Sequence, residues 1–227
     1  MKYNNILFDA DGTLFDFKLA EYTALSDTLA HFGLPDNPDV HQKYSAANAE
    51  QWTLLEKKLI KRDELRINRF RNFCGKVGFS EDPQKMADFY ENSLSHKGFL
   101  IEGAIDICKM LSKYCDLYII TNGFRHIQTG RFAASPLLLF FKQVFISQDV
   151  GVEKPDPRFF AFVEDHIPGF QKQTALVVGD SLSSDIAGGL QYGLDSCWFN
   201  PAGVTPPEAM KINYTISSLS ELQKIVL

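Results

Sequence analysis

The chain has 227 residues, of which 45% are hydrophobic and 22% charged, and its formal net charge is −5 at pH 7. This composition excludes a disordered chain and suffices for the core of one large domain, or of one domain with an insertion. The negative charge and the absence of a basic tract argue against a nucleic-acid partner. No apolar run is long enough for a membrane span or signal peptide, and the four cysteines lack metal-like spacing, so we expect reduced thiols and a cytoplasmic location.

The first predicted strand is the apolar run 6–8, and a long helical segment follows it. From about residue 18 to residue 94 there is almost no strand signal, and charged residues alternate with large apolar residues at helical spacing. Clusters of glycine and proline divide this stretch into about four helices. We therefore expect an inserted all-helical domain over residues 17–98.

Beyond residue 100, short apolar runs alternate with helical stretches. Runs without polar alternation are typical of parallel strands that are covered on both faces. The predicted strands lie at 117–120, 144–146, 175–178 and 196–199, and a capping box at 218–221 predicts a terminal helix. The sequence thus predicts an α/β fold, in which residues 1–16 and 99–227 form a core with a central parallel sheet.

Two acids, Asp9 and Asp11, directly follow the first strand. If the backbone stayed extended, both carboxylates would point to one side and repel each other, and a cation would relieve that repulsion. Mg²⁺ binds well to paired carboxylates together with water and phosphate oxygens. Gly12 permits a tight turn at this point, and open α/β sheets bind ligands at the carboxyl ends of their strands.

Three further groups of polar residues follow other predicted strands. The first, Thr121 and Asn122, offers a hydroxyl and backbone donors to a phosphate oxygen. The second is Lys154, which could neutralise phosphate and keep a carboxylate ionised. The third is a second acid pair, Asp180 and Asp185. Each group alone is a weak signal, but together they predict a metal-assisted phosphate site.

These residues resemble the four motifs of the haloacid dehalogenase-like (HAD) hydrolase superfamily, matched by Asp9/Asp11, Thr121, Lys154 and Asp180/Asp185. The resemblance implies a Rossmann-like core with a helical cap. It also implies a phosphatase in which Asp9 attacks phosphorus and forms a phosphoaspartyl intermediate, while Asp11 protonates the leaving alcohol and then activates water. Because a dehalogenase needs only the nucleophile, Asp11 favours phosphate chemistry.

The same resemblance assigns the ligands of the site. Mg²⁺ would be held by Asp9, the backbone carbonyl of Asp11 and Asp180, with Asp185 supporting the metal shell. Thr121, Asn122 and Lys154 would bind the phosphoryl group and stabilise its charge.

Longer runs, including 8–17, 121–124, 146–155 and 197–200, resemble the YjjG-type pyrimidine nucleotidases. This resemblance implies hydrolysis of nucleoside 5′-monophosphates such as dUMP, dTMP or UMP. A base needs a flat apolar surface and polar groups at its edge, and the candidates are Phe17, Trp52 and Asn48, which could instead be residues of the cap core. The segment 125–137 departs from the pattern, and its conformation stays open apart from a helix stop at Pro136.

Other functions remain compatible with the sequence. A phosphatase or phosphomutase for sugar phosphates or other small metabolites would share the same motifs. A binding or regulatory protein that had lost the chemistry would lack at least one motif acid or the lysine, and all are present. We expect a small-molecule phosphate ester as substrate and a monomer or homodimer.

Overall fold

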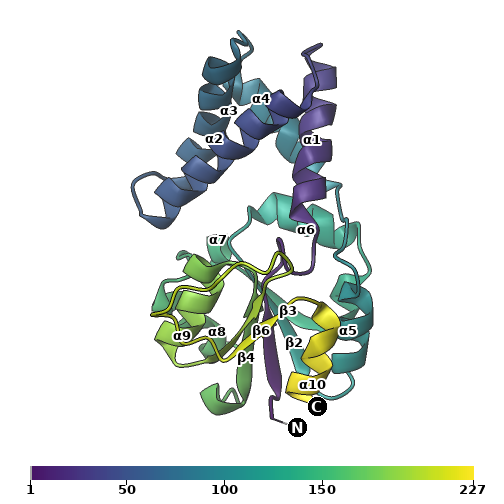
Figure 1. The fold of residues 1–227 in the computed structure, drawn as a ribbon, viewed down its shortest axis with the longest axis vertical. Coiled ribbons are helices and arrows are strands. Elements are labelled where there is room, and N and C mark those ends of the chain that lie inside the picture. Colours follow the sequence, from purple (N-terminus) through teal and green to yellow (C-terminus); the bar gives the residue numbers. More distant parts are fainter. Residues whose placement is uncertain (1) are drawn as a thin grey trace. The chain divides into compact units, whose positions relative to one another are not determined.

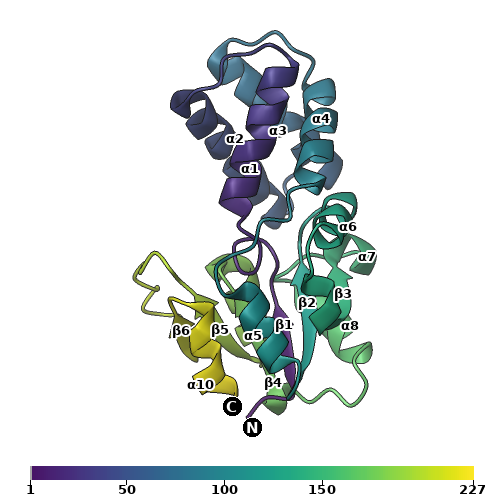
Figure 2. The ribbon, with the colours of Figure 1, turned by 90° about the vertical axis from the view of Figure 1, so that its right-hand side faces the viewer.

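The computed structural model describes residues 2–227, which divide into two compact units. The segment ending at Phe17 and the segment Gly98–Leu227 together form an α/β unit. The segment Lys18–Lys97 forms a helical unit. Figures 1 and 2 show the sheet of the first unit and the helices of the second.

The α/β unit is built on a parallel sheet, which has six strands within the described residues, in the order β3-β2-β1-β4-β5-β6. The strands are β1 Asn5–Phe8, β2 Asp116–Thr121, β3 Phe141–Ile146, β4 Ala175–Gly179, β5 Asp195–Phe199 and β6 Tyr214–Ile216. All five predicted strands are present, so the predicted α/β class is confirmed. The short edge strand β6 was missed because three residues after a turn-rich loop give no clear apolar run.

Helices cover both faces of this sheet (Figure 2). They are α5 Ala104–Leu111, α6 Arg125–Ala133, α7 Ser147–Val150, α8 Pro157–Asp165, α9 Ala187–Tyr192 and α10 Leu222–Val226. Single turns lie at Leu137–Phe140, Lys172–Thr174, Leu182–Ile186 and Leu219–Glu221. The predicted capping box at Ser218 and Glu221 is formed, and it starts the turn that leads into α10.

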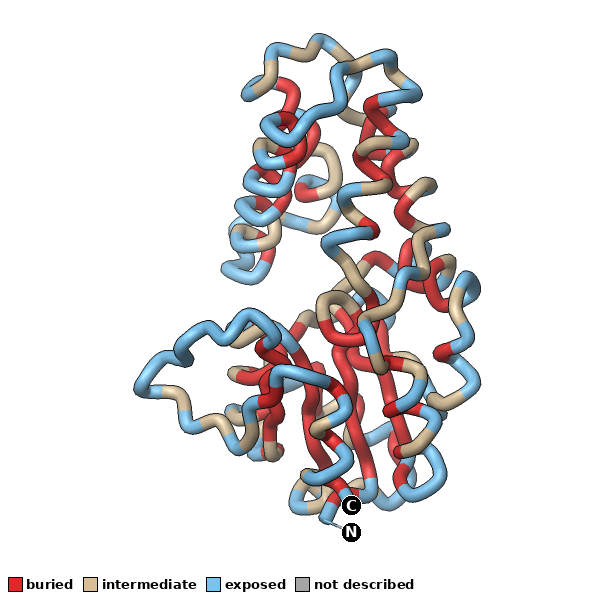
Figure 3. Tube along the Cα trace, turned by 45° about the vertical axis from the view of Figure 1, so that its right-hand side comes forward, coloured by how far each residue is buried: buried red, intermediate tan, exposed pale blue. Residues whose placement is uncertain are grey.

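Alternate residues of each central strand face opposite helical layers. In β1, Ile6 and Phe8 pack in the cluster that contains residues of α5 and α10, whereas Leu7 packs in the cluster that contains residues of α8. Strands β2 and β4 alternate in the same way, and Figure 3 shows the central strands as mostly buried. Burial on both faces explains why these strands appear in the sequence as unbroken apolar runs.

The helical unit contains α1 Phe17–His31, α2 Pro38–Glu56, α3 Arg62–Val77 and α4 Pro83–Ser95, the first beginning at the last residue of the α/β segment. Asn37 and Asp82 cap α2 and α4 with their side chains, and a proline occupies the first turn of each. Buried rings of Tyr44, Phe70 and Tyr90 meet with centroids 5.2–5.4 Å apart and form the core of this unit.

The position of β1 in the sheet determines where a ligand site can form. Strand β1 pairs with β2 on one side and with β4 on the other. The chain adds β2 and β3 on one side of β1 and then β4, β5 and β6 on the other side, so the direction of strand addition changes between β1 and β4. Such a switch point leaves a crevice in which open α/β sheets bind ligands. The residues that follow β1, β2 and β4 therefore converge there.

No helix among residues 2–227 combines the length and the hydropathy that a membrane crossing requires.

Candidate active site

Three carboxylates, which we call the acidic centre, lie together at the carboxyl ends of β1 and β4. Asp9 follows β1, Asp180 follows β4, and Asp185 lies in the turn Leu182–Ile186. One oxygen from each of the three lies within 4.8 Å of the others, an arrangement that could hold a metal ion. The fold thus joins acids that are up to 176 residues apart in the chain, and all three were predicted.

Lys154 is the cation at this centre. Its Nζ atom lies 2.7 Å from Asp9 Oδ1 and 2.6 Å from Asp185 Oδ1, and it donates to the backbone oxygen of Ile120 at 2.7 Å. The side chain is 1% exposed. Burial alone would lower the pKa of Lys154, but the charges of Asp185 and Asp9 outweigh it and raise the pKa above its ordinary value. These contacts therefore favour the charged form of the lysine.

One buried lysine does not neutralise three carboxylates. Burial raises the pKa of Asp9 well above its ordinary value, and the charge of Asp185 adds to this effect while Lys154 opposes it. Desolvation by the surrounding atoms, together with the charge of Asp185, raises the pKa of Asp180 to about 7. A further cation at this point would favour the ionised form of both acids.

Two glycines let the backbone approach these acids closely. Gly12 has a φ of +86°, and a Cβ atom there would collide with the Asp180 carboxylate. A Cβ atom on Gly179 would collide with Asp185 in the same way. The predicted tight turn at Gly12 is thus present. Carboxylate oxygens are the ligands that a hard divalent cation such as Mg²⁺ prefers, and the glycines allow these oxygens to lie close together.

Thr121 and Asn122, at the end of β2, have different partners. The Thr121 hydroxyl oxygen accepts a hydrogen bond from the Gly123 amide at 3.0 Å, which leaves its proton available to a ligand. The Asn122 side chain instead brackets Lys154: Nδ2 donates to the Lys154 carbonyl at 2.9 Å, and Oδ1 accepts from the Lys154 amide at 3.0 Å. Asn122 thus fixes the backbone that carries the lysine, and its contact with phosphate stays a prediction.

The carboxylate of Asp11 has partners outside the acidic centre. Arg131 Nη1 contacts its Oδ1 atom, and Gln128 Nε2 donates to its Oδ2 atom at 2.5 Å. The positive charge beside the Asp11 side chain is therefore the Arg131 guanidinium of α6. From the sequence we expected a metal cation to offset the charge of this side chain. The conformation of segment 125–137 was left open by the sequence; its residues Arg125–Ala133 form α6, and Pro136 precedes the next turn.

Several contacts at the site have no clear signal in the sequence. Gln128 and Arg131 lie 117 and 120 positions from Asp11, and only their spacing of three on one helix hints at a shared face. Thr13 lies 3.3 Å from Asp9 Oδ2 through its hydroxyl, and Trp198 Nε1 donates to the Asp180 backbone oxygen at 2.8 Å.

The three candidate substrate residues lie on α1 and α2. Phe17 starts α1, is partly buried, and has its ring centroid 5.7 Å from the Arg131 guanidinium. Asn48 is 4% exposed; its Nδ2 donates to Glu21 at 2.8 Å. Trp52 is partly exposed on α2, one turn after Asn48 and on the same side of that helix.

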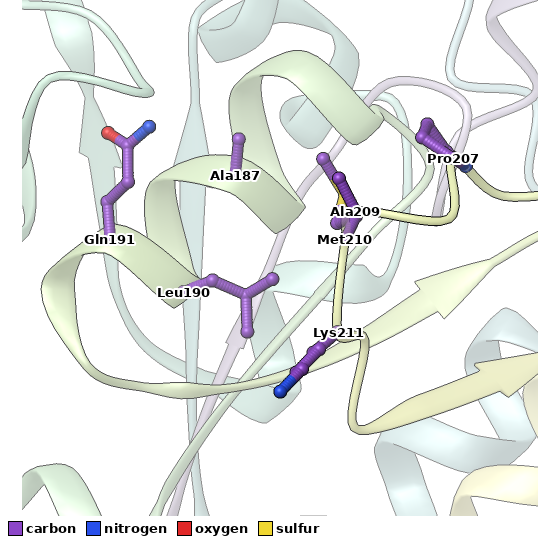
Figure 4. A pocket seen from close by; sticks show the side chains of 7 residues that line it. All are labelled: Ala187, Leu190, Gln191, Pro207, Ala209, Met210 and Lys211. Atoms are coloured by element: carbon purple, nitrogen blue, oxygen red, sulfur yellow. The ribbon is translucent and has the colours of Figure 1, made fainter.

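Two cavities among the described residues lie away from the acidic centre. One of about 480 Å³ lies between α9 and the loop that precedes β6 (Figure 4), lined by Ala187, Leu190, Gln191, Pro207, Ala209, Met210 and Lys211. Another, of about 340 Å³, lies within the helical unit and is lined by Lys18, Glu21, Tyr22, Leu25, His41, Tyr44 and Ser45.

Comparisons with known proteins agree with this geometry. A family model described as haloacid dehalogenase-like hydrolase matches residues 3–193. YfnB of Bacillus subtilis, named as a HAD-hydrolase, is 36% identical over 99% of this chain and 96% of its own. The magnesium-bound crystal structure of YfnB, described as revealing interdomain movement, matches with a TM-score of 0.95 over 100% of this chain and 99% of that one.

Two further relatives carry names that state an activity. The pyrimidine 5′-nucleotidase PynA of Streptococcus pneumoniae is 37% identical over 98% of this chain and 94% of its own. The pyrimidine 5′-nucleotidase YjjG of Escherichia coli is 30% identical over 100% of this chain and 99% of its own. With the family match over most of its length and the motif residues gathered at one edge of the sheet, the chain belongs to the haloacid dehalogenase-like hydrolase family.

Proposed function

We propose that this protein is a Mg²⁺-dependent phosphatase that hydrolyses nucleoside 5′-monophosphates, with a pyrimidine as the base. The observation that carries the phosphatase assignment is the contact of Lys154 with both Asp9 and Asp185, beside Asp180. A carboxylate nucleophile beside a buried lysine and further acids suits attack on a phosphate dianion, because the lysine and a metal ion together offset its charge.

Mg²⁺ would be held by Asp9, by the backbone carbonyl of Asp11 and by Asp180, with Asp185 supporting the metal shell. The fit rests on the three clustered carboxylates and on the close approach of Gly12 to Asp180. When bound, the ion would supply positive charge to the oxygens of the transferring phosphoryl group.

The side chains of the protein would carry out the proton and phosphoryl transfers. Asp9 attacks phosphorus, and the Thr121 hydroxyl and the Lys154 ammonium stabilise the charge on the transferring group. Asp11 enters this step in its protonated form and gives that proton to the leaving 5′-oxygen as the P–O bond breaks. It then takes a proton from the water that attacks the phosphoaspartyl group, which releases phosphate and restores Asp9.

The nucleotide assignment is supported by PynA and YjjG, which resemble this chain along nearly their whole lengths. We propose that residues 17–98 act as a cap domain that selects the substrate. Phe17 and Trp52 would contact the flat face of the base, and Asn48 would contact its polar edge. Asn48 also donates a hydrogen bond to Glu21. Four buried, free thiols are compatible with the cytoplasmic location that we expect.

A panel of phosphate esters tests this proposal. The purified protein with Mg²⁺ is incubated with dUMP, dTMP, UMP, purine nucleotides and sugar phosphates, and both phosphate and organic products are measured. We expect the highest kcat/KM with a pyrimidine nucleotide. A far higher kcat/KM with a sugar phosphate would contradict the nucleotide assignment, and an isomerised product with little free phosphate would indicate a phosphomutase.

A further inference from the structure

Two side chains of α6 hold both oxygens of the Asp11 carboxylate. Gln128 Nε2 donates to Oδ2 at 2.5 Å, and an Nη1 hydrogen of Arg131 contacts Oδ1. Gln128 and Arg131 are three positions apart, so they lie on the same face of the helix. The Asp11 side chain itself is 24% exposed and lies on the loop after β1, where it would otherwise be free to rotate.

Both holding side chains are buried. Arg131 is fully buried, and its guanidinium carbon lies 4.5 Å from the Phe15 ring centroid and 5.7 Å from that of Phe17. A planar guanidinium packed against aromatic rings is held in one orientation, and so are its donors. Because a buried charge costs free energy unless it is paired, the position of Arg131 is poorly explained by packing alone.

Gln128 connects Asp11 to a second part of the site. It is fully buried, and the Nε2 atom that binds Asp11 also lies 3.3 Å from the hydroxyl oxygen of Thr121. The side chain lies against Gly123, where any Cβ atom would collide with it. One amide group therefore sets the position of the Asp11 carboxylate relative to the end of β2.

We propose that Gln128 and Arg131 are positioning residues that orient Asp11 for proton transfer to the leaving oxygen. This inference rests on the proposed phosphatase function. A carboxylate whose two oxygens are both bound retains further lone pairs for a proton, but it no longer rotates. The orientation is thus present before substrate binds, and the proton need not wait for a favourable rotamer.

Two substrates with different leaving groups distinguish positioning of the acid Asp11 from a merely structural role of Gln128 and Arg131. The 5′-oxygen of dUMP is a poor leaving group and needs a proton, whereas p-nitrophenolate leaves as a stable anion. The value to compare is kcat/KM, because it reports the steps through phosphoenzyme formation and not the later attack of water. General acid–base catalysis contributes typically about 10²–10⁴-fold, and loss of orientation alone removes part of that.

We therefore expect Arg131→Met and Gln128→Leu each to lower kcat/KM for dUMP by at least about 10-fold, and that for p-nitrophenyl phosphate by less than about 3-fold. Arg131→Lys should restore part of the loss. Arg125→Met, at the exposed first position of the same helix, is the matched control and should change neither value. In an Asp11→Asn background, Arg131→Met should have almost no further effect on dUMP hydrolysis.

Equal losses with the two substrates, or a full further loss in the Asp11→Asn background, would overturn the inference. If Arg131→Met fails to fold, Gln128→Leu still tests the inference, because this substitution removes no buried charge. If the wild-type protein hydrolyses neither substrate in the presence of Mg²⁺, the proposed function itself fails. That outcome is distinct from a wild-type phosphatase whose α6 variants show no leaving-group dependence.

Discussion

At the scale of single residues, the acidic centre carries more negative charge than the protein alone neutralises. Lys154 contacts Asp9 and Asp185 but not Asp180, and desolvation together with the charge of Asp185 raises the pKa of both Asp9 and Asp180. This electrostatic conflict costs stability in the metal-free protein and creates affinity for a cation.

The first prediction concerns how stability changes with pH. The pKa of Asp180 is about 7 in the folded protein, against about 4 in an unfolded chain. Between these values the unfolded chain has lost a proton that the folded protein keeps, so the free energy of unfolding falls as pH rises from about 4 to about 7. Calorimetry in chelator should show this loss in the wild-type protein and a smaller one in Asp180→Asn.

Added Mg²⁺ provides the control for that measurement. Since a bound ligand stabilises only the folded state, Mg²⁺ should raise the Tm of the wild-type protein most above pH 7. Asp180→Asn should respond much less. The same pH slope in both proteins would show that Asp180 is not the origin of the effect.

The second prediction concerns Lys154. Its removal leaves Asp9 and Asp185 buried without their cation, and breaking a buried ion pair in this way costs about 3–5 kcal/mol. Lys154→Met should lower the free energy of unfolding by that amount in urea titrations, and kcat by at least about 100-fold. Lys43→Met, which removes an exposed lysine paired with Asp39, should cost less than about 1 kcal/mol. Comparable losses from the two substitutions would contradict the assigned role of Lys154.

At the scale of elements, the loops after β1 and β4 are packed against each other through Gly12. The third prediction compares Gly12→Ala with Gly193→Ala. Both glycines have a φ of +86°, but a Cβ atom on Gly193 would meet nothing within 4 Å. Both variants should lose about 1–2 kcal/mol from the left-handed backbone.

Only Gly12→Ala should also displace Asp180, so it should weaken Mg²⁺ binding at least about 10-fold in calorimetric titrations. Equal Mg²⁺ affinities in the two variants would mean that the loop contact does not shape the metal site.

The sequence was informative about elements whose pattern is local. Five of the strands, the helical segment and the acids that follow β1 and β4 could be predicted, because buried parallel strands appear as apolar runs and ligands gather at their ends. The partners of Asp11 could not, since Gln128 and Arg131 meet it only once β1 and β2 pair. Nor could the role of the Asn122 side chain, which depends on the loop that carries Lys154.

At the scale of the whole molecule, the helical unit is inserted between β1, which is followed by Asp9, and β2, which ends at Thr121. No stretch of chain on one side of the insertion contains the complete site. Assembly of the site therefore requires the parallel pairing of β1 with β2 and β4.

The fourth prediction concerns selection of the substrate by the helical unit. If Trp52 contacts the base, Trp52→Ala should raise KM for dUMP about 5-fold, because an aromatic contact is worth on the order of 1 kcal/mol. KM for deoxyribose 5-phosphate, which has no base, should be unchanged. Thr53→Ala, at the exposed neighbouring position, is the control. An equal rise in KM for both substrates would exclude a base contact.

The covalent intermediate on Asp9 tests the central claim most directly. The protein is mixed with dUMP labelled with ³²P in the phosphate, quenched in acid within milliseconds, digested and analysed for the labelled peptide. The account predicts label on the peptide that contains Asp9, its disappearance on a chase with unlabelled dUMP, and neither label nor turnover in Asp9→Asn. Undiminished hydrolysis by Asp9→Asn, or label on a peptide that lacks Asp9, would contradict it.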